Sequence, residues 1–371
     1  MIKKDEKSNI LSVICMISFA ISLIANGNIT TVAKYSSDWK ADVWFMAFSK
    51  WAIPLLIMTV GYCYLNSKYN FSLESLSEVS YFKNKELNNR SRSYFKKDKA
   101  FRMRGMVLKS IISCLIIWIF SSLFYMSHVH NGEYDFDTLL ECMSKVLKEP
   151  YFIAFYQLIV MLFVFYPLLK QISNSKKLTT YAVILFLAIA IVNRLIVFIP
   201  FGKYVYMFTS QINWNNFTAY GLYLFVGIFI SRINLKWYIR MIFYLSFFII
   251  TAGMYSLFIF NSIGKVDKAL LDELQILLSG IQACAVFVLV MQLSKRINKH
   301  IPFVKMNVLS ESLYMYVAVF VILYFALNDS INFHGMAFVW QKILEVLILL
   351  VLSLTVCIIL RKIPFIKRIT T

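Results

Sequence analysis

The sequence predicts an all-α, polytopic integral membrane protein with about ten transmembrane helices and both termini in the cytoplasm. Three observations lead to this fold class. Of the 371 residues, 60% are apolar and only 15% are charged, whereas a soluble domain carries roughly 25% charged residues. The apolar residues gather in segments of about 20, the length at which a helix crosses a bilayer. Lys and Arg concentrate in alternate connections, which is the positive-inside pattern.

Ten segments are long and apolar enough to span. They are residues 9–27, 43–65, 105–127, 151–170, 178–200, 215–233, 237–260, 271–293, 309–327 and 339–360. No repeat of fixed period interrupts them, so we expect a single membrane domain over residues 1–371. The first segment is not followed by a small-residue cleavage site, so we expect no cleavable signal peptide.

The basic residues give the predicted orientation. Of the 38 Lys and Arg residues, 27 lie on the N-terminal side of the predicted spans, 7 lie in the opposite connections and 4 lie within spans. Because cytoplasmic connections carry the excess of Lys and Arg, we place both termini in the cytoplasm. The net charge of +19 follows from this orientation, and we do not expect a nucleic-acid partner.

Two connections are long. Residues 67–104 are cytoplasmic, polar and basic, and they either lie on anionic lipid headgroups or attract an anionic donor such as an acyl-coenzyme A (acyl-CoA). Residues 128–150 face outward. Within them, DFDTLLECMSKVLKE has apolar residues at helical spacing, which predicts a short amphipathic helix at the membrane interface.

The cysteines and histidines do not form a recognisable metal site. No CxxC occurs among the six cysteines, so neither a zinc site nor a disulfide framework is predicted, and Cys142 is the one placed in a loop. All four histidines fall in predicted loops. His128 and His130 form an HVH pair, but no carboxylate spacing completes a site. We interpret the pair as solvated and expect no metal.

Ionisable residues inside spans are costly and are therefore candidates for function. Four of them have structural explanations. Lys109 is near the end of its span and can extend toward water. Glu311 is in an early helical turn, where the helix dipole favours a negative charge. Lys342 and Glu345 are three residues apart on one helix face and can pair.

Lys50 and Arg194 are harder to explain in this way. Arg194 follows Asn193 in the middle of an apolar run. Lys50 precedes Pro54, which frees a backbone carbonyl near residue 50, and such a broken helix is tolerated where it lines a cavity. Gly61 would let another helix approach closely. The stretch therefore predicts a kinked helix that places a cation in a polar cavity. The alternative is a lysine extending toward the membrane surface beside an ordinary proline kink.

Several stretches resemble the membrane acyltransferase-3 family. KWAIPLLIMTVGYCYL is similar to its second-span signature, in which a cation precedes a Pro-Leu run that ends in Gly-Tyr or Gly-Phe. FRMRGMVLKSIISCLIIW, with Arg102 and Arg104, is similar to the basic start of its third span. EPYFIAFYQLIVMLFVFYPLLKQI, YGLYLFVGIFISR and SESLYMYVAVFVIL resemble later spans. The resemblance extends over nearly the whole chain.

This resemblance implies transfer of an acyl group, commonly acetyl, from a cytoplasmic acyl-CoA to a sugar hydroxyl. The acceptor would be a cell-surface or exported polysaccharide or its lipid-linked precursor. The implied partners are the lipid bilayer and this glycan, and the implied location is the bacterial inner membrane. It also implies that Lys50, Arg194, Arg102 and Arg104 bind substrates.

The sequence departs from the family at its catalytic pair. The family's chemistry is assigned to an Arg and a His in the first span, where Ser12 and Leu23 stand here, and Val319 stands at a second His. No histidine lies in any predicted span. Glu311 is our candidate for a replacement base, because burial favours the neutral form of a carboxyl group.

Two other functions remain open. A catalytically inactive relative could bind a glycan or help to export it, as the missing histidines suggest. An unrelated glycan-handling protein, such as an O-antigen polymerase or a flippase, could share the number of spans. A polymerase would be expected to carry a larger outer loop with arginines, and a transporter to show an inverted repeat. Neither is evident in the sequence.

Overall fold

A computed structural model describes residues 14–22, 24, 33–65, 118–119, 122–123, 136–148, 165, 168–196, 202, 204, 214–266, 268–297, 319–320, 323–324, 338–360 and 362. Every regular element in these residues is a helix, and no strand occurs among them. The predicted all-α class is therefore confirmed for this part of the chain.

Four helices are long and apolar enough to cross a membrane: Ser37–Val60, Trp237–Ser262, Leu274–Leu293 and Val339–Leu360. A fifth candidate is the bent pair Leu168–Asn174 and Lys176–Val192, whose two parts meet at 119°. These helices correspond to the predicted spans at 43–65, 178–200, 237–260, 271–293 and 339–360. The shorter apolar helix Phe217–Arg232 lies within the span predicted at 215–233. Of the predicted span at 9–27, residues 14–22 and 24 are described and are helical. The predicted spans at 105–127, 151–170 and 309–327 lie largely outside the described residues.

The first of these spans consists of two helices, α2 (Ser37–Ser49) and α3 (Ala52–Val60), followed by a π-helix, η1 (Gly61–Leu65). Ser36 caps α2 by accepting a hydrogen bond from the Trp39 amide at 3.1 Å. The break falls at Lys50 and Trp51. Pro54 has no N–H to donate to the carbonyl of residue 50, and the hydrogen-bond ladder resumes where the Leu55 amide donates to the Trp51 carbonyl at 2.9 Å. The predicted break near residue 50 is confirmed.

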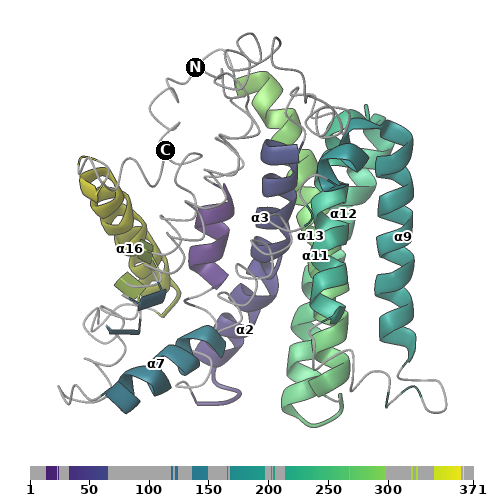
Figure 1. The fold of residues 1–371 in the computed structure, drawn as a ribbon. Coiled ribbons are helices and arrows are strands. Elements are labelled where there is room, and N and C mark those ends of the chain that lie inside the picture. Colours follow the sequence, from purple (N-terminus) through teal and green to yellow (C-terminus); the bar gives the residue numbers. More distant parts are fainter. Residues whose placement is uncertain are drawn as a thin grey trace.

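The other long helices are α9 (Lys176–Leu195), α11 (Trp214–Arg232), α12 (Trp237–Ser262), α13 (Lys268–Ile297) and α16 (Phe338–Leu360). Helices α9, α11, α12 and α13 stand together on one side of α2 and α3, and α16 stands on the other side (Figure 1). The most extensive packing joins α12 with α13, α11 with α9, and α11 with α3.

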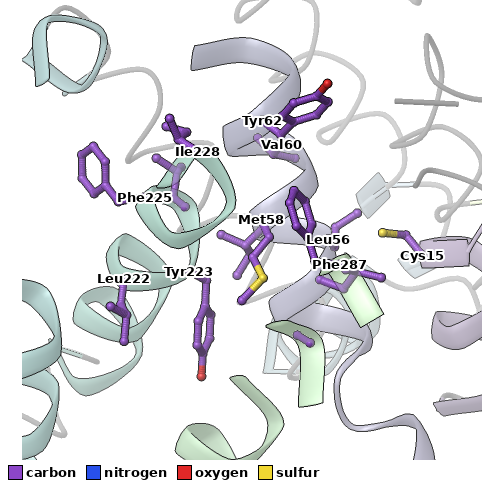
Figure 2. Packing of buried hydrophobic residues seen from close by; sticks show 14 of the residues in the cluster. Cys15, Leu56, Met58, Val60, Tyr62, Leu222, Tyr223, Phe225, Ile228 and Phe287 are labelled. Carbon is purple, nitrogen blue, oxygen red and sulfur yellow. The ribbon is translucent and has the colours of Figure 1, made fainter. Parts of the chain in front are cut away.

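The largest core cluster lies where α3 packs against α11 and α13. Met58 of α3, Tyr223 and Phe225 of α11, and Phe287 of α13 are all buried there (Figure 2). The predicted close approach at Gly61 is confirmed, because a Cβ added to this residue would collide with the backbone carbonyl oxygen of Leu224 on α11.

The outward faces of the long helices are strongly apolar. On α12, Trp237 is 70% exposed and Phe248 is 68% exposed, and on α16 Val351 is 60% exposed. Apolar patches of this extent are rare on soluble monomers and mark surfaces that meet lipid or another protein. Together with the span lengths, they agree with a membrane protein.

The amphipathic helix predicted within residues 128–150 is α7 (Phe136–Lys148). Its Met143 carbonyl accepts a hydrogen bond from Trp118 Nε1 at 3.0 Å. Cys142, the cysteine predicted to lie in a connection between spans, lies in this helix and is fully buried.

Candidate functional site

Lys50 lies at the break between α2 and α3, and it is the predicted site residue whose surroundings are described. Its side chain is half-buried. The Nζ atom lies 5.8 Å from the centre of the Phe258 ring on α12, within the range of a cation–π interaction. Asp272, near the start of α13, acts on the amine electrostatically. The cation therefore lies near one aromatic side chain of α12 and one acidic side chain of α13.

Arg194 is in the last turn of α9, and its side chain is outside the described part of the structure. Helix α9 packs against α11, whereas α2 packs against α12 and α16. The backbones that carry Arg194 and Lys50 therefore belong to different helix pairs. Arg102, Arg104 and Glu311 lie outside the described residues, as do all four histidines.

A second group of cations lies where α9 begins and α11 ends. Lys170, in the short helix Leu168–Asn174, is 1% exposed. Its Nζ donates to the carbonyl of Leu65 at 2.6 Å, and Ser173 Oγ donates to the same carbonyl at 3.0 Å. The carbonyl of Leu65, the last residue of η1, therefore accepts two side-chain hydrogen bonds.

The bend between Asn174 and Lys176 brings further basic residues to this place. Arg232, the last residue of α11, acts electrostatically on Lys170, and its Nη1 donates to Thr179 Oγ1 of α9 at 3.4 Å. Lys176 and Lys177 begin α9 and are exposed. We call Lys170, Lys176, Lys177 and Arg232 the basic cluster.

An open depression adjoins the basic cluster on the first turns of α9. It has a volume of about 420 Å³ and is lined by Lys176, Lys177, Thr180, Tyr181 and Ile184. Along the helix the two lysines come first, followed by Thr180, Tyr181 and Ile184, and the lining itself is mostly apolar. Such a surface suits the apolar or aromatic part of a ligand whose anionic group meets the lysines outside the depression.

Sequence reasoning did not select the basic cluster. Lys170 and Arg232 were counted only as cytoplasmic loop charges, and the count itself gives no sign that Lys170 is buried. The one available signal is the QIS stretch after Lys170, in which Ser173 stands on the same helix face three residues later. That spacing occurs by chance in many helices.

The pairing predicted for Lys342 and Glu345 is confirmed. Lys342 Nζ lies 2.8 Å from Glu345 Oε2 on α16. Asp42 of α2 is buried near this pair, which acts on it electrostatically. Within the described residues, no group of three or more His, Cys, Asp and Glu side chains is arranged to hold a metal ion.

Comparison of the chain with models of protein families, with curated proteins and with solved structures found no match.

Proposed function

We propose that this protein is a membrane O-acyltransferase. It would transfer an acyl group, acetyl in the simplest case, from a cytoplasmic acyl-CoA to a sugar hydroxyl of an envelope polysaccharide or its lipid-linked precursor. The observation that carries the proposal is the position of the basic cluster. Lys170 of this cluster donates a hydrogen bond to Leu65 at the end of η1. This π-helix directly follows the span Ser37–Val60, and the stretch from Lys50 to Tyr62 that resembles the family runs from that span into η1.

The basic cluster supports binding of a phosphate-bearing donor. Coenzyme A carries several phosphate charges, and Lys and Arg side chains bind phosphate through charge-assisted hydrogen bonds. Lys176 and Lys177 are exposed and Arg232 is half-buried, so these three can meet a ligand. Lys170 is buried and donates a hydrogen bond to the Leu65 carbonyl of η1. The π-helix η1 at this position also fits a site, since short π-helical segments within α-helices occur frequently at functional sites.

In the proposed reaction, the sugar hydroxyl attacks the thioester carbonyl. The new C–O bond forms, the C–S bond breaks, and the hydroxyl proton passes through a base to the departing coenzyme A thiolate. Glu311 is the proposed base. Lys50 and Arg194 are the proposed substrate-binding cations, and each could stabilise a developing oxyanion. Arg102 and Arg104 would join the donor side.

One observation favours a second candidate, a non-catalytic protein that binds a glycan or helps to export it. No histidine lies in any predicted span, so the base that the family uses is missing. The same membrane helices would then serve binding alone.

The donor site can be tested with the purified full chain in lipid nanodiscs and isotopically labelled acetyl-CoA. We expect binding, and we expect the triple substitution Lys176→Gln, Lys177→Gln and Arg232→Gln to raise the Kd about tenfold or more. Each lost charge contact is worth up to about 1 kcal/mol, and about 1.4 kcal/mol corresponds to tenfold in affinity.

Lys236→Gln is the matched control. Lys236 is an exposed lysine in the turn that follows α11, and we expect this substitution to leave the Kd unchanged. An intact protein that does not bind acetyl-CoA, or a triple variant that binds it as tightly as the wild type, would contradict the proposal.

A further inference from the structure

Three ionisable side chains meet at the contact between α2 and α16. Asp42 of α2 is 1% exposed and Glu345 of α16 is 2% exposed. Lys342 is paired with Glu345, and both act on Asp42 electrostatically. Each helix forms part of a candidate membrane span. We call Asp42, Lys342 and Glu345 the Asp42 cluster.

Three of the four carboxyl oxygens of this cluster have no hydrogen-bond partner among the described residues. They are both side-chain oxygens of Asp42 and Oε1 of Glu345, and all three are buried. An ionised carboxylate that is removed from water without compensating contacts is costly, and such a group usually becomes neutral instead. Within the described part of the chain, the positive charge near Asp42 is that of Lys342, which is already paired with Glu345. Asp42 therefore needs a proton or a further positive charge.

Counting charges indicates a proton. Two carboxylates and one ammonium leave one net negative charge, which a single proton removes. A calcium ion would take about six to eight oxygen ligands, whereas the Asp42 cluster offers three unpartnered oxygens. The Lys342 ammonium would also repel any metal cation placed beside it.

Other titratable groups are differently placed. Asp38 lies one turn before Asp42 and acts on it, but its side chain is exposed. From α12, Tyr255 packs against the apolar cluster around α2. From α13, Asp272 acts on Lys50. The groups that face Asp42 from α16 are Lys342 and Glu345.

We propose that Asp42, Lys342 and Glu345 form a site that binds one proton between two membrane-spanning helices. This function goes beyond acyl transfer and does not depend on it. Loss of the proton leaves a negative charge buried between α2 and α16, which weakens their contact and favours entry of water. The site thereby links proton binding to the separation of α16 from the rest of the described helices.

The proposal is tested by infrared spectroscopy of the purified full-length protein in lipid nanodiscs. The carbonyl stretch of protonated carboxylic acids is recorded as the pH is raised. We expect Asp42→Asn to lose one protonated carboxyl relative to the wild type at neutral pH. Glu345→Gln should also lose this protonated-carboxyl signal, because Asp42 then ionises and pairs with Lys342. Lys342→Met should gain the signal of a second protonated carboxyl, because neither carboxylate then has an ammonium partner.

Asp38→Asn is the matched control, since it makes the same chemical change one turn away on an exposed side chain. It should leave the spectrum unchanged. Asn resembles a protonated Asp in shape and charge, so Asp42→Asn should keep the melting temperature of the wild type. If that variant does not fold, Glu345→Gln provides the same spectroscopic test.

Two results would overturn the proposal. One is equal protonated-carboxyl intensity at neutral pH in the wild type, Asp42→Asn and Glu345→Gln. The other is loss of the wild-type signal when choline is replaced by sodium at fixed pH, which would assign the site to a metal cation.

Discussion

At the scale of single residues, two glycines permit the contact between α3 and α11. A Cβ on Gly61 would collide with the carbonyl oxygen of Leu224, and a Cβ on Gly227 would collide with that of Met58. The two backbones therefore touch reciprocally. In a membrane, where lipid is as apolar as the side chains, close backbone contact at small residues is a main source of helix association.

We expect Gly61→Ala to lower the free energy of unfolding by about 1–3 kcal/mol, the usual cost of overpacking. The collision is with backbone atoms, which cannot rotate away. Thermal or denaturant unfolding in detergent measures this change. The matched control is Gly253→Ala on α12, where a Cβ would meet nothing within 4 Å. There the better helix propensity of alanine should raise stability by about 0.5–1 kcal/mol. Equal effects at the two positions would contradict the packing.

The sequence predicted the Lys342–Glu345 pair but missed Asp42, for a physical reason. Residues three apart on a helix share a face, so the pair follows from spacing alone. Hydropathy, in contrast, sums over a window. Asp38, Lys40 and Asp42 lowered the window value and shifted the predicted start of the span to residue 43, although α2 begins at Ser37. Which face of a helix carries a charge, and what covers it, depends on the neighbouring helix.

At the scale of elements, Gln282 joins three helices. This residue of α13 is fully buried. Its Nε2 donates to the Ala47 carbonyl of α2 at 3.3 Å and to Thr251 Oγ1 of α12 at 2.8 Å. The bond to Ala47 lies three residues before the break at Lys50, so it holds α2 where its direction is least constrained by its own hydrogen bonds.

We predict that Gln282→Met, which keeps the volume but removes the donor, lowers the free energy of unfolding by about 1 kcal/mol. The estimate takes about 0.6 kcal/mol for each interhelical hydrogen bond in a membrane. Ser256→Ala is the control, because Ser256 Oγ bonds the Ala252 carbonyl of its own helix. A loss in the control as large as that in Gln282→Met would count against an interhelical role.

The sequence anticipated most described elements. Pro54 revealed the break near Lys50, since proline lacks the donor that a helix interior needs. The spacing of apolar residues revealed α7. The 119° bend before Lys176 falls in the predicted connection between the spans at 151–170 and 178–200, although neither proline nor glycine marks its position. It is stabilised by contacts that are distant in sequence, such as the hydrogen bond from Lys170 to Leu65.

At the scale of the whole molecule, the helix ends form two sets. At one end, the Tyr35 hydroxyl donates to the Ser262 carbonyl at 2.8 Å, which joins the start of α2 to the end of α12. At the other end, Arg232 and Thr179 join the end of α11 to the start of α9. The sequence predicts that the first set faces outward and the second faces the cytoplasm.

Cysteine labelling tests this orientation. Lys265→Cys and Lys236→Cys place thiols at exposed positions in the turns at the two ends of α12, in a background where the native cysteines are replaced by serine. In intact cells, a membrane-impermeant maleimide should label residue 265 and should label residue 236 only after permeabilisation. The reverse pattern would invert the orientation and move the basic cluster away from the cytoplasmic donor.

Composition and charge distribution were sufficient to predict a helical membrane protein, since both follow from the apolar solvent around it. They could not predict which side chains meet. Lys50 was selected as a site residue, yet its contacts with Phe258 and its proximity to Asp272 depend on how α12 and α13 pack against α2. The basic cluster is likewise assembled from segments far apart in the sequence.

Analysis of acyl groups on the surface glycan tests acyl transfer most directly. Mass spectrometry would compare a deletion strain with strains complemented by the wild type or by Lys50→Ala with Arg194→Ala. Acyl transfer predicts that the wild type restores a substituent and that the double variant does not, after which Glu311→Gln tests the base. If the glycan's substitution never changes while its amount or export does, acyl transfer is contradicted and the binding or export function takes its place.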